Sequence, residues 1–111
     1  MGLSTHILDT ALGRPAAGVS LTLAKRDGDS WSDIGSGITD SDGRCKTLLG
    51  ETPLEAATYR IRFATAEYFA PQNLVSLYPY VEIVFTVANP DQHHHIPLLL
   101  TANGYTTYRG S

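Results

Sequence analysis

The chain has very little cysteine, no long hydrophobic run and no concentration of positive charge. Cys45 is the single cysteine in 111 residues, so no internal disulfide can form. No apolar run approaches the ~20 residues that a helix needs to cross a bilayer. The eight Lys and Arg residues are scattered and the net charge is -3, whereas nucleic-acid binders gather positive charge on one surface. We therefore expect no membrane association and no nucleic-acid partner.

The sequence also lacks the motifs of several enzyme classes. Neither a glycine-rich phosphate loop nor a Gly-x-Ser-x-Gly turn is present, so phosphoryl transfer and α/β-hydrolase chemistry are not expected. The first residues show no basic segment followed by an apolar one, which is the pattern of a secretory signal. We therefore expect the protein to reside in the cytoplasm.

Length and composition are those of an ordinary globular domain. Of the 111 residues, 42% are hydrophobic and 17% are charged, which is neither a disordered nor a membrane composition. A chain of this size can bury a sizeable core without cross-links. Because no linker, repeat or low-complexity run interrupts the sequence, we expect one domain over residues 1–111.

Short segments rich in β-branched and aromatic residues alternate with Gly, Pro, Asn and Asp, and helical periodicity is nearly absent. This pattern predicts a mainly-β chain. The expected strands are Thr5–Asp9, Val19–Arg26, Trp31–Thr39, Arg44–Thr47, Tyr59–Phe63, Tyr80–Val87, His93–Leu100 and Tyr105–Tyr108. About eight short strands separated by turns favour an all-β fold, a sandwich of two sheets.

A turn and one short helix complete this expectation. Asp40-Ser41-Asp42-Gly43 is a turn signal, because Asp side chains bond nearby backbone amides and Gly accepts a positive φ. Arg44 then lies directly beyond a tight turn, where a side chain is well placed. The stretch 64–69 is the one candidate helix, with Thr65 as its N-cap and Pro71 as its boundary.

Four polar groups stand where strands or turns would hold them: His6, Arg44, His95 and the ending Tyr108-Arg109-Gly110-Ser111. Taken singly, each has an ordinary structural explanation. Chain ends usually fray, so a patterned ending directly after a strand-like Tyr/Thr run predicts a tail that is held in place and used. The four groups carry chemistry only if the fold brings them together.

The run His93-His94-His95 allows two kinds of chemistry. Strand alternation places His93 and His95 on one face and His94 on the other. Two imidazoles on one face can bind zinc, but such a site usually needs a third or fourth ligand, and none is evident in the sequence. Incidental metal binding at His93 and His95 stays open, whereas general acid–base catalysis is the favoured use of a histidine here.

Several segments taken together resemble one family. They are Leu3-Ser4-Thr5-His6-Ile7-Leu8-Asp9-Thr10, Gly13-Arg14-Pro15-Ala16, Asp42-Gly43-Arg44, His95-Ile96-Pro97-Leu98-Leu99-Leu100 and Tyr105-Thr106-Thr107-Tyr108-Arg109-Gly110-Ser111. In this order, over nearly the whole chain, they are similar to the transthyretin-related 5-hydroxyisourate hydrolases. The Tyr-Arg-Gly-Ser ending is the discriminating motif, because the hormone-carrying transthyretins share the fold but lack it.

The resemblance implies a fold, an activity and an assembly. The fold is a transthyretin-like β-sandwich of two sheets with one short helix. The activity is hydrolysis of 5-hydroxyisourate to 2-oxo-4-hydroxy-4-carboxy-5-ureidoimidazoline in urate catabolism, with no metal and no other cofactor. The assembly is a homotetramer, a dimer of dimers, with active sites in the grooves where two dimers meet.

The resemblance also assigns residues. Its catalytic set falls on His6, Arg44, His95 and Ser111, and its substrate-binding tail falls on Tyr108, Arg109 and Gly110. Opening a ring acyl bond with water needs a base, an acid and a cation. Either histidine can act as the base, and the planar Arg44 guanidinium suits the developing oxyanion.

Two alternatives come from other functional classes. The first is a non-catalytic carrier of a small aromatic ligand, which an apolar channel would serve better than two histidines and an arginine. The second is a plain interaction module whose histidines are structural. The sequence leaves open which histidine is the base.

Overall fold

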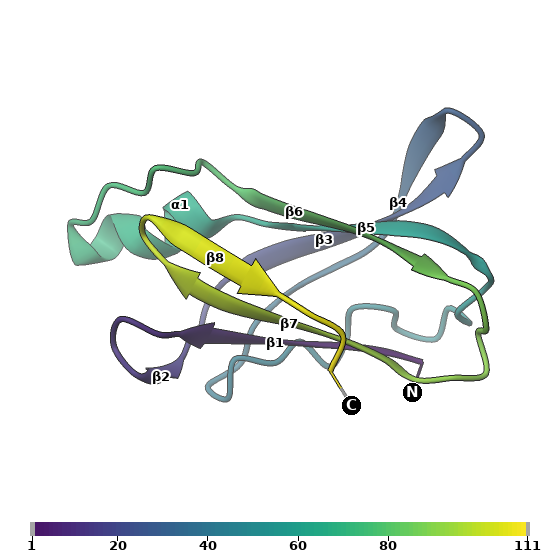
Figure 1. Cartoon of the computed structure of the whole chain (residues 1–111), viewed down its shortest axis with the longest axis horizontal. Coiled ribbons are helices and arrows are strands. Elements are labelled where there is room, and N and C mark those ends of the chain that lie inside the picture. Colours follow the sequence, from purple (N-terminus) through teal and green to yellow (C-terminus); the bar gives the residue numbers. More distant parts are fainter. Residues whose placement is uncertain (1, 111) are drawn as a thin grey trace.

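The computed structural model describes residues 2–110, which form two four-stranded sheets packed face to face (Figure 1). The elements in chain order are β1 (Leu3–Asp9), β2 (Arg14–Pro15), β3 (Ser20–Asp27), β4 (Ser30–Ile38), β5 (Ala57–Phe63), α1 (Thr65–Phe69), the 3₁₀ turn η1 (Ala70–Gln72), β6 (Val81–Val87), β7 (His94–Thr101) and β8 (Gly104–Thr107). Sheet A has the strand order β2-β1-β7-β8, and sheet B has the order β4-β3-β5-β6. The predicted all-β sandwich with one short helix is confirmed.

Two details of the strand prediction are wrong. The expected strand Arg44–Thr47 is reduced to a single bridge between Arg44 and His6, because the chain turns away at once: the Gly50 N–H donates to the Thr47 carbonyl at 3.1 Å. Strand β2 was not expected, since two residues are too short for any periodicity. It forms because the chain reverses after β1 and pairs Arg14 with Asp9.

The predicted N-cap of the helix also needs correction. Ala64, not Thr65, is the N-cap residue of α1, and no side chain caps the helix. Thr65 is buried inside the first turn, and its hydroxyl has no hydrogen-bond partner. The predicted end is confirmed: α1 stops at Phe69, before Pro71, which lies in the first turn of η1, where a missing N–H costs nothing. No helix within residues 2–110 is long and apolar enough to span a membrane.

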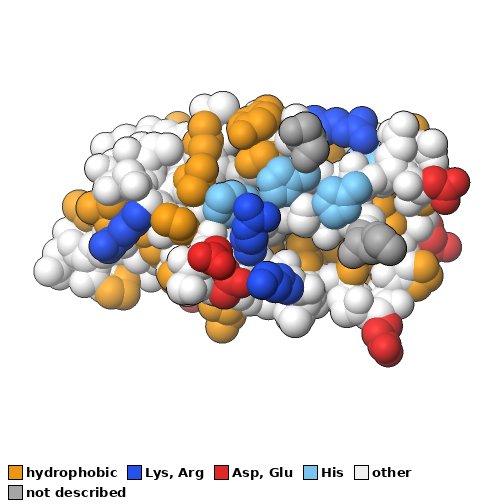
Figure 2. Space-filling view, turned by 90° about the horizontal axis from the view of Figure 1, so that it is seen from below, with side chains coloured by type: hydrophobic (Ala, Val, Ile, Leu, Met, Phe, Trp, Pro, Cys, Tyr) orange, Lys and Arg blue, Asp and Glu red, His pale blue; other side chains and the backbone are white. Residues whose placement is uncertain are grey.

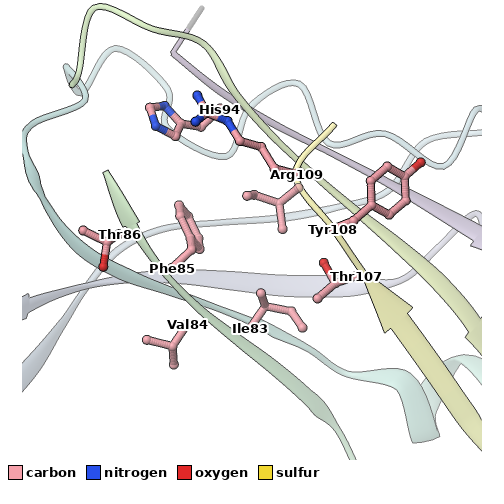
Figure 3. Close-up of a pocket in the computed structure, with 9 residues that line it drawn as sticks. Ile83, Val84, Phe85, Thr86, His94, Thr107, Tyr108 and Arg109 are labelled. Carbon is pink, nitrogen blue, oxygen red and sulfur yellow. The ribbon is translucent and has the colours of Figure 1, made fainter. Parts of the chain in front are cut away.

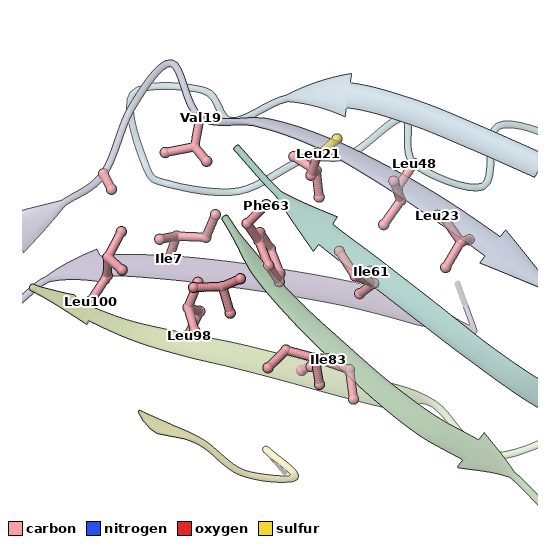
Figure 4. Packing of buried hydrophobic residues seen from close by; sticks show 14 of the residues in the cluster. Ile7, Val19, Leu21, Leu23, Leu48, Ile61, Phe63, Ile83, Leu98 and Leu100 are labelled. Atoms are coloured by element: carbon pink, nitrogen blue, oxygen red, sulfur yellow. The ribbon is translucent and has the colours of Figure 1, made fainter. Parts of the chain in front are cut away.

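The core lies between the two sheets, and strands such as β1 and β6 turn alternate side chains toward it. In β1 the buried positions are Leu3, Thr5, Ile7 and Asp9, and the positions between them are only half-buried. Figure 4 shows how apolar side chains from both sheets meet around Phe63. Each large aliphatic side chain buried in this way contributes about 1.5–3 kcal/mol of transfer free energy.

The buried carboxylate of Asp9 links α1 to the loop after β1 through hydrogen bonds. Asp9 is 1% exposed, and its Oδ1 accepts hydrogen bonds from the amides of Ala11 (3.1 Å) and Leu12 (3.0 Å). The Tyr68 hydroxyl donates to Oδ2 at 2.7 Å. Burial, and then this bond with Asp9, raises the pKa of Tyr68 to about 12. The phenol therefore stays protonated and donating.

Strands β1 and β7 form a parallel pair, which brings together two parts of the chain that are far apart in sequence. The register places Ser4 beside His95 and His6 beside Pro97. The other strand pairs among the described residues are antiparallel. This one non-local pairing decides which side chains meet on the outer face of sheet A.

Candidate active site

Two of the predicted histidines lie on the outer face of sheet A. His6 is a half-buried position of β1, and His95 is a half-buried position of β7. His95 is level with Ser4, two residues before His6, and side chains two apart on a strand share a face. Both imidazoles therefore face away from the core, on neighbouring strands.

A tight turn brings Arg44 to the same place. The Asp40 carboxylate accepts hydrogen bonds from the amides of Asp42 (2.9 Å) and Arg44 (3.1 Å), and the Arg44 bond is the main reason why the pKa of Asp40 is lowered. The amide of Ile7 donates to the Gly43 carbonyl at 2.8 Å, and Arg44 pairs with His6. The turn signal in the sequence thus places an arginine at the edge of β1.

The end of the chain lies against His95 from the other side. The Gly110 amide donates to the His95 carbonyl at 2.8 Å. A Cβ built on Gly110 would overlap Cδ2 of the His95 ring and lie 3.0 Å from its Cγ. Only glycine allows the backbone to approach the ring this closely. Ser111, which was predicted to be catalytic, lies outside the described residues.

The charges at this centre act on one another. The pKa of His95 is lowered, first by burial and then by the positive charges of Arg44, His6 and His93. A lowered pKa keeps the imidazole neutral at neutral pH, and only the neutral ring can accept a proton. His6, Arg44 and His95 thus converge on one face, as the hypothesis from the sequence required.

Figure 2 shows this face, where His side chains (pale blue) gather beside Lys and Arg side chains (dark blue). Arg44 also lines a cavity of about 260 Å³ together with Ser4, Lys46 and His93. Ser4 was not among the predicted site residues, because a serine on a strand carries no distinctive signal. Its place two residues before His6 was the only indication.

Two tail residues lie elsewhere. Tyr108 and Arg109 line a cavity of about 280 Å³ between β6 and the end of β8, and the Arg109 side chain extends toward His94 (Figure 3). Nη2 of Arg109 donates to Oε1 of Gln92 at 3.3 Å. Within a single chain, Gly110 is the described tail residue that contacts His95.

The histidine run alternates as predicted. His93 and His95 share the outer face, since Nε2 of His93 and Nδ1 of His95 each lie 2.7 Å from Oγ of Ser4. His94 is 5% exposed on the opposite face, and its Nδ1 lies 2.9 Å from the Gln92 carbonyl. Among residues 2–110, no three His, Cys, Asp or Glu side chains are grouped to hold a metal ion.

Comparison with known proteins places the chain in a family. A 5-hydroxyisourate hydrolase of Caulobacter vibrioides is 46% identical over 114 residues, with 99% of this chain and 98% of that protein covered. The solved 5-hydroxyisourate hydrolase of Klebsiella pneumoniae is 33% identical, with a TM-score of 0.87 and full coverage of both chains. Sea bream transthyretin in complex with thyroxine is also 33% identical, with a TM-score of 0.92 over 99% of this chain and 95% of that one.

Hydrolases and a thyroxine-bound transthyretin thus share this fold, so the fold alone does not decide between catalysis and ligand binding. The family model described as "HIUase/Transthyretin family" matches residues 3–110. The chain belongs to the HIUase/Transthyretin family.

Proposed function

We propose that this protein is a 5-hydroxyisourate hydrolase, which opens its substrate to 2-oxo-4-hydroxy-4-carboxy-5-ureidoimidazoline without a metal or other cofactor. One observation carries the proposal: His6, Arg44 and His95 meet on the outer face of sheet A. Relatives with the name 5-hydroxyisourate hydrolase cover almost the whole chain at 40–46% identity, which supports the same substrate.

Each of the three side chains has a role that its surroundings favour. His95 is the general base, because burial and neighbouring positive charge keep its imidazole neutral. Arg44 binds the carbonyl edge of the substrate and stabilises the negative charge that develops as water attacks. His6, held beside Arg44, delivers a proton to the ring nitrogen that leaves. Ser111, Tyr108, Arg109 and Gly110 complete the pocket in this proposal.

The competing function is non-catalytic transport of a small aromatic ligand. The similarity to sea bream transthyretin, which was solved in complex with thyroxine, suggests this alternative. Carriers need apolar pockets with a few orienting polar groups. The outer face of sheet A instead presents two imidazoles and a guanidinium close together, which is a catalytic constellation. Binding of an iodinated phenol without any hydrolysis of 5-hydroxyisourate would reverse this ranking.

The active form in this proposal is a homotetramer, built as a dimer of dimers. Strands β6 and β8 are edges of their sheets, and exposed edges pair readily with another chain. Large apolar side chains lie exposed near them, among them Leu77 (68%), Val84 (57%) and Tyr108 (54%). Native mass spectrometry gives the number of chains. A purely monomeric, fully active protein would contradict this part of the proposal.

A cytoplasmic location completes the proposal, and the free thiol of buried Cys45 suits a reducing compartment. Cell fractionation tests it directly.

The decisive test of the activity is addition of the protein to freshly generated 5-hydroxyisourate. Its decay is followed by ultraviolet absorbance, and the handedness of the product by circular dichroism. Because the substrate also decays spontaneously, the rate is compared with a protein-free sample. We expect faster decay and an optically active product. An unchanged rate with a racemic product would refute the proposal.

A further inference from the structure

The hydroxyl of Ser4 joins two histidines in one chain of hydrogen bonds. Oγ of Ser4 lies 2.7 Å from Nδ1 of His95 and 2.7 Å from Nε2 of His93. His93 is exposed, while Ser4 and His95 are half-buried. Nε2 of His95 has no hydrogen bond to any residue between 2 and 110, so it is free to face a substrate or a water molecule.

A hydroxyl has one proton to donate, which links the tautomers of the two rings. If Ser4 donates to His93, it must accept from the Nδ1–H of His95, and Nε2 of His95 is then bare and basic. If Ser4 donates to His95 instead, it accepts from the Nε2–H of His93, and Nε2 of His95 carries the proton. The two arrangements correspond to His95 before and after it acts as a base.

We propose that Ser4 and His93 form a proton relay behind His95. This inference rests on the proposed function, and it makes Ser4 and His93 positioning residues that act through His95.

The relay moves charge without losing a proton. Nε2 of His95 takes a proton from the attacking water, its Nδ1 proton passes to Oγ of Ser4, and the Ser4 proton passes to Nε2 of His93. The positive charge then resides on His93, and His95 is neutral with a proton on Nε2. The leaving nitrogen takes its proton from His6. The same three transfers in reverse then release the proton on Nε2 of His95, through water, to His6, and restore the starting state.

The surroundings of the two rings favour this transfer. His95 is faced by Arg44, by His6 on β1 and by the Gly110 backbone. The positive charges of Arg44 and His6 therefore disfavour a positive charge on His95. His93 is faced by Arg44 and Lys46 across the cavity that they share, but it is exposed, and water solvates its charge. A charge on His93 is therefore less costly than the same charge on His95.

Steady-state kinetics of Ser4→Ala, His93→Gln and the double variant test the relay. The amide that His93→Gln introduces can bond to Ser4 but cannot carry a proton onward. We expect kcat to fall about tenfold in each single variant, which is less than the 10²- to 10⁴-fold loss for the base itself. KM should stay unchanged, and Ser4→Thr should restore the rate. The double variant should be no slower than Ser4→Ala, because both changes break one chain of bonds.

A matched control is Lys46→Gln, which removes a charge from the same cavity and leaves both Ser4 and His93 in place. It should leave kcat within about twofold of the parent. Two results would overturn the relay. One is a loss of kcat in the double variant equal to the product of the two single losses, and the other is a loss of kcat in Lys46→Gln as large as that in His93→Gln.

Nuclear magnetic resonance of the imidazole nitrogens tests the relay even if the protein proves inactive. We expect His93 and His95 to titrate as a coupled pair, and Ser4→Ala to change the tautomer populations of both rings. Independent titrations with unchanged tautomers would refute the relay while leaving the proposed function intact. An inactive wild-type protein with a coupled pair would refute the function alone.

Discussion

The two faces of sheet A use polar side chains in opposite ways. On the inner face every hydrogen-bonding side chain of β1 is fully engaged by the fold: Thr5 donates to the Ile96 carbonyl at 2.6 Å, and Asp9 accepts from two amides and from Tyr68. On the outer face His6 and His95 are half-buried, next to Arg44. Alternation along one strand thus separates the groups that hold the fold from those available for chemistry.

The largest effect on turnover should come from removing the outer-face groups one at a time. His6→Ala, Arg44→Ala and His95→Ala should each lower turnover by about 10²-fold or more, because each removes an acid, a base or the cation. Urea denaturation should show an almost unchanged free energy of unfolding. A variant with a wild-type rate would show that its residue takes no part in the reaction.

An inner-face substitution should have the reverse effect. Leu98 is 0% exposed, and Leu98→Ala should lower the free energy of unfolding by about 2–5 kcal/mol through lost contacts and a cavity. Urea denaturation measures the loss, and Ser36→Ala, at an exposed position of β4, is the control. The folded fraction should keep its kcat, and a large drop in kcat would show that the two faces are coupled.

The contact between Gly110 and His95 allows a sharper test on the outer face. Gly110→Ala forces a methyl group onto the imidazole and should displace it, which costs about 10- to 100-fold in kcat. Gly104→Ala is the matched control, since a Cβ there lies 3.8 Å from the nearest atom, Oγ1 of Thr101. Equal activity of the two variants would show that the ring tolerates movement.

The Asp9–Tyr68 contact belongs to the structural side of the comparison. Tyr68→Phe removes the hydroxyl that donates to Asp9, and the buried carboxylate keeps its two amide donors. We expect a loss of about 1–2 kcal/mol in the free energy of unfolding and no change in kcat, by urea denaturation and substrate decay. A loss of activity without a loss of stability would contradict this assignment.

The smallest effect concerns pH. His95 acts as a base only when it is neutral. The value of kcat/KM should therefore be highest at pH values above the pKa of His95, and it should fall as the pH falls through that pKa. Because burial and positive neighbours lower the pKa of His95, the acid limb should lie below the ordinary value of 6.5. Arg44→Gln removes one of these charges and should move the His95 titration upward, as nuclear magnetic resonance can measure. A downward shift would show that Arg44 does not act on His95.

Local pattern predicted much of the fold. Alternation identified β1 and β7 and placed His93 and His95 on one face, because strand geometry is set within a few residues. It failed at Arg44–Thr47, where turns overrode the β-forming residues, and at β2, which exists only through pairing with β1.

The site depends on information that no local pattern contains. The parallel register between β1 and β7 brings Ser4 and His6 to His95, and only the resemblance to a family indicated that these residues meet. Ser4 was missed because its importance comes from its two partners rather than from its chemical type.

The β1–β7 pairing also sets when the protein can become active. Ser4 and His95 are 91 positions apart, so during synthesis β1 cannot pair with β7 until the 91 residues that follow Ser4 have left the ribosome. Such distant pairing folds slowly. Enzymatic turnover in a translation mixture would therefore report a late step of folding, because it can start only after β1 has paired with β7.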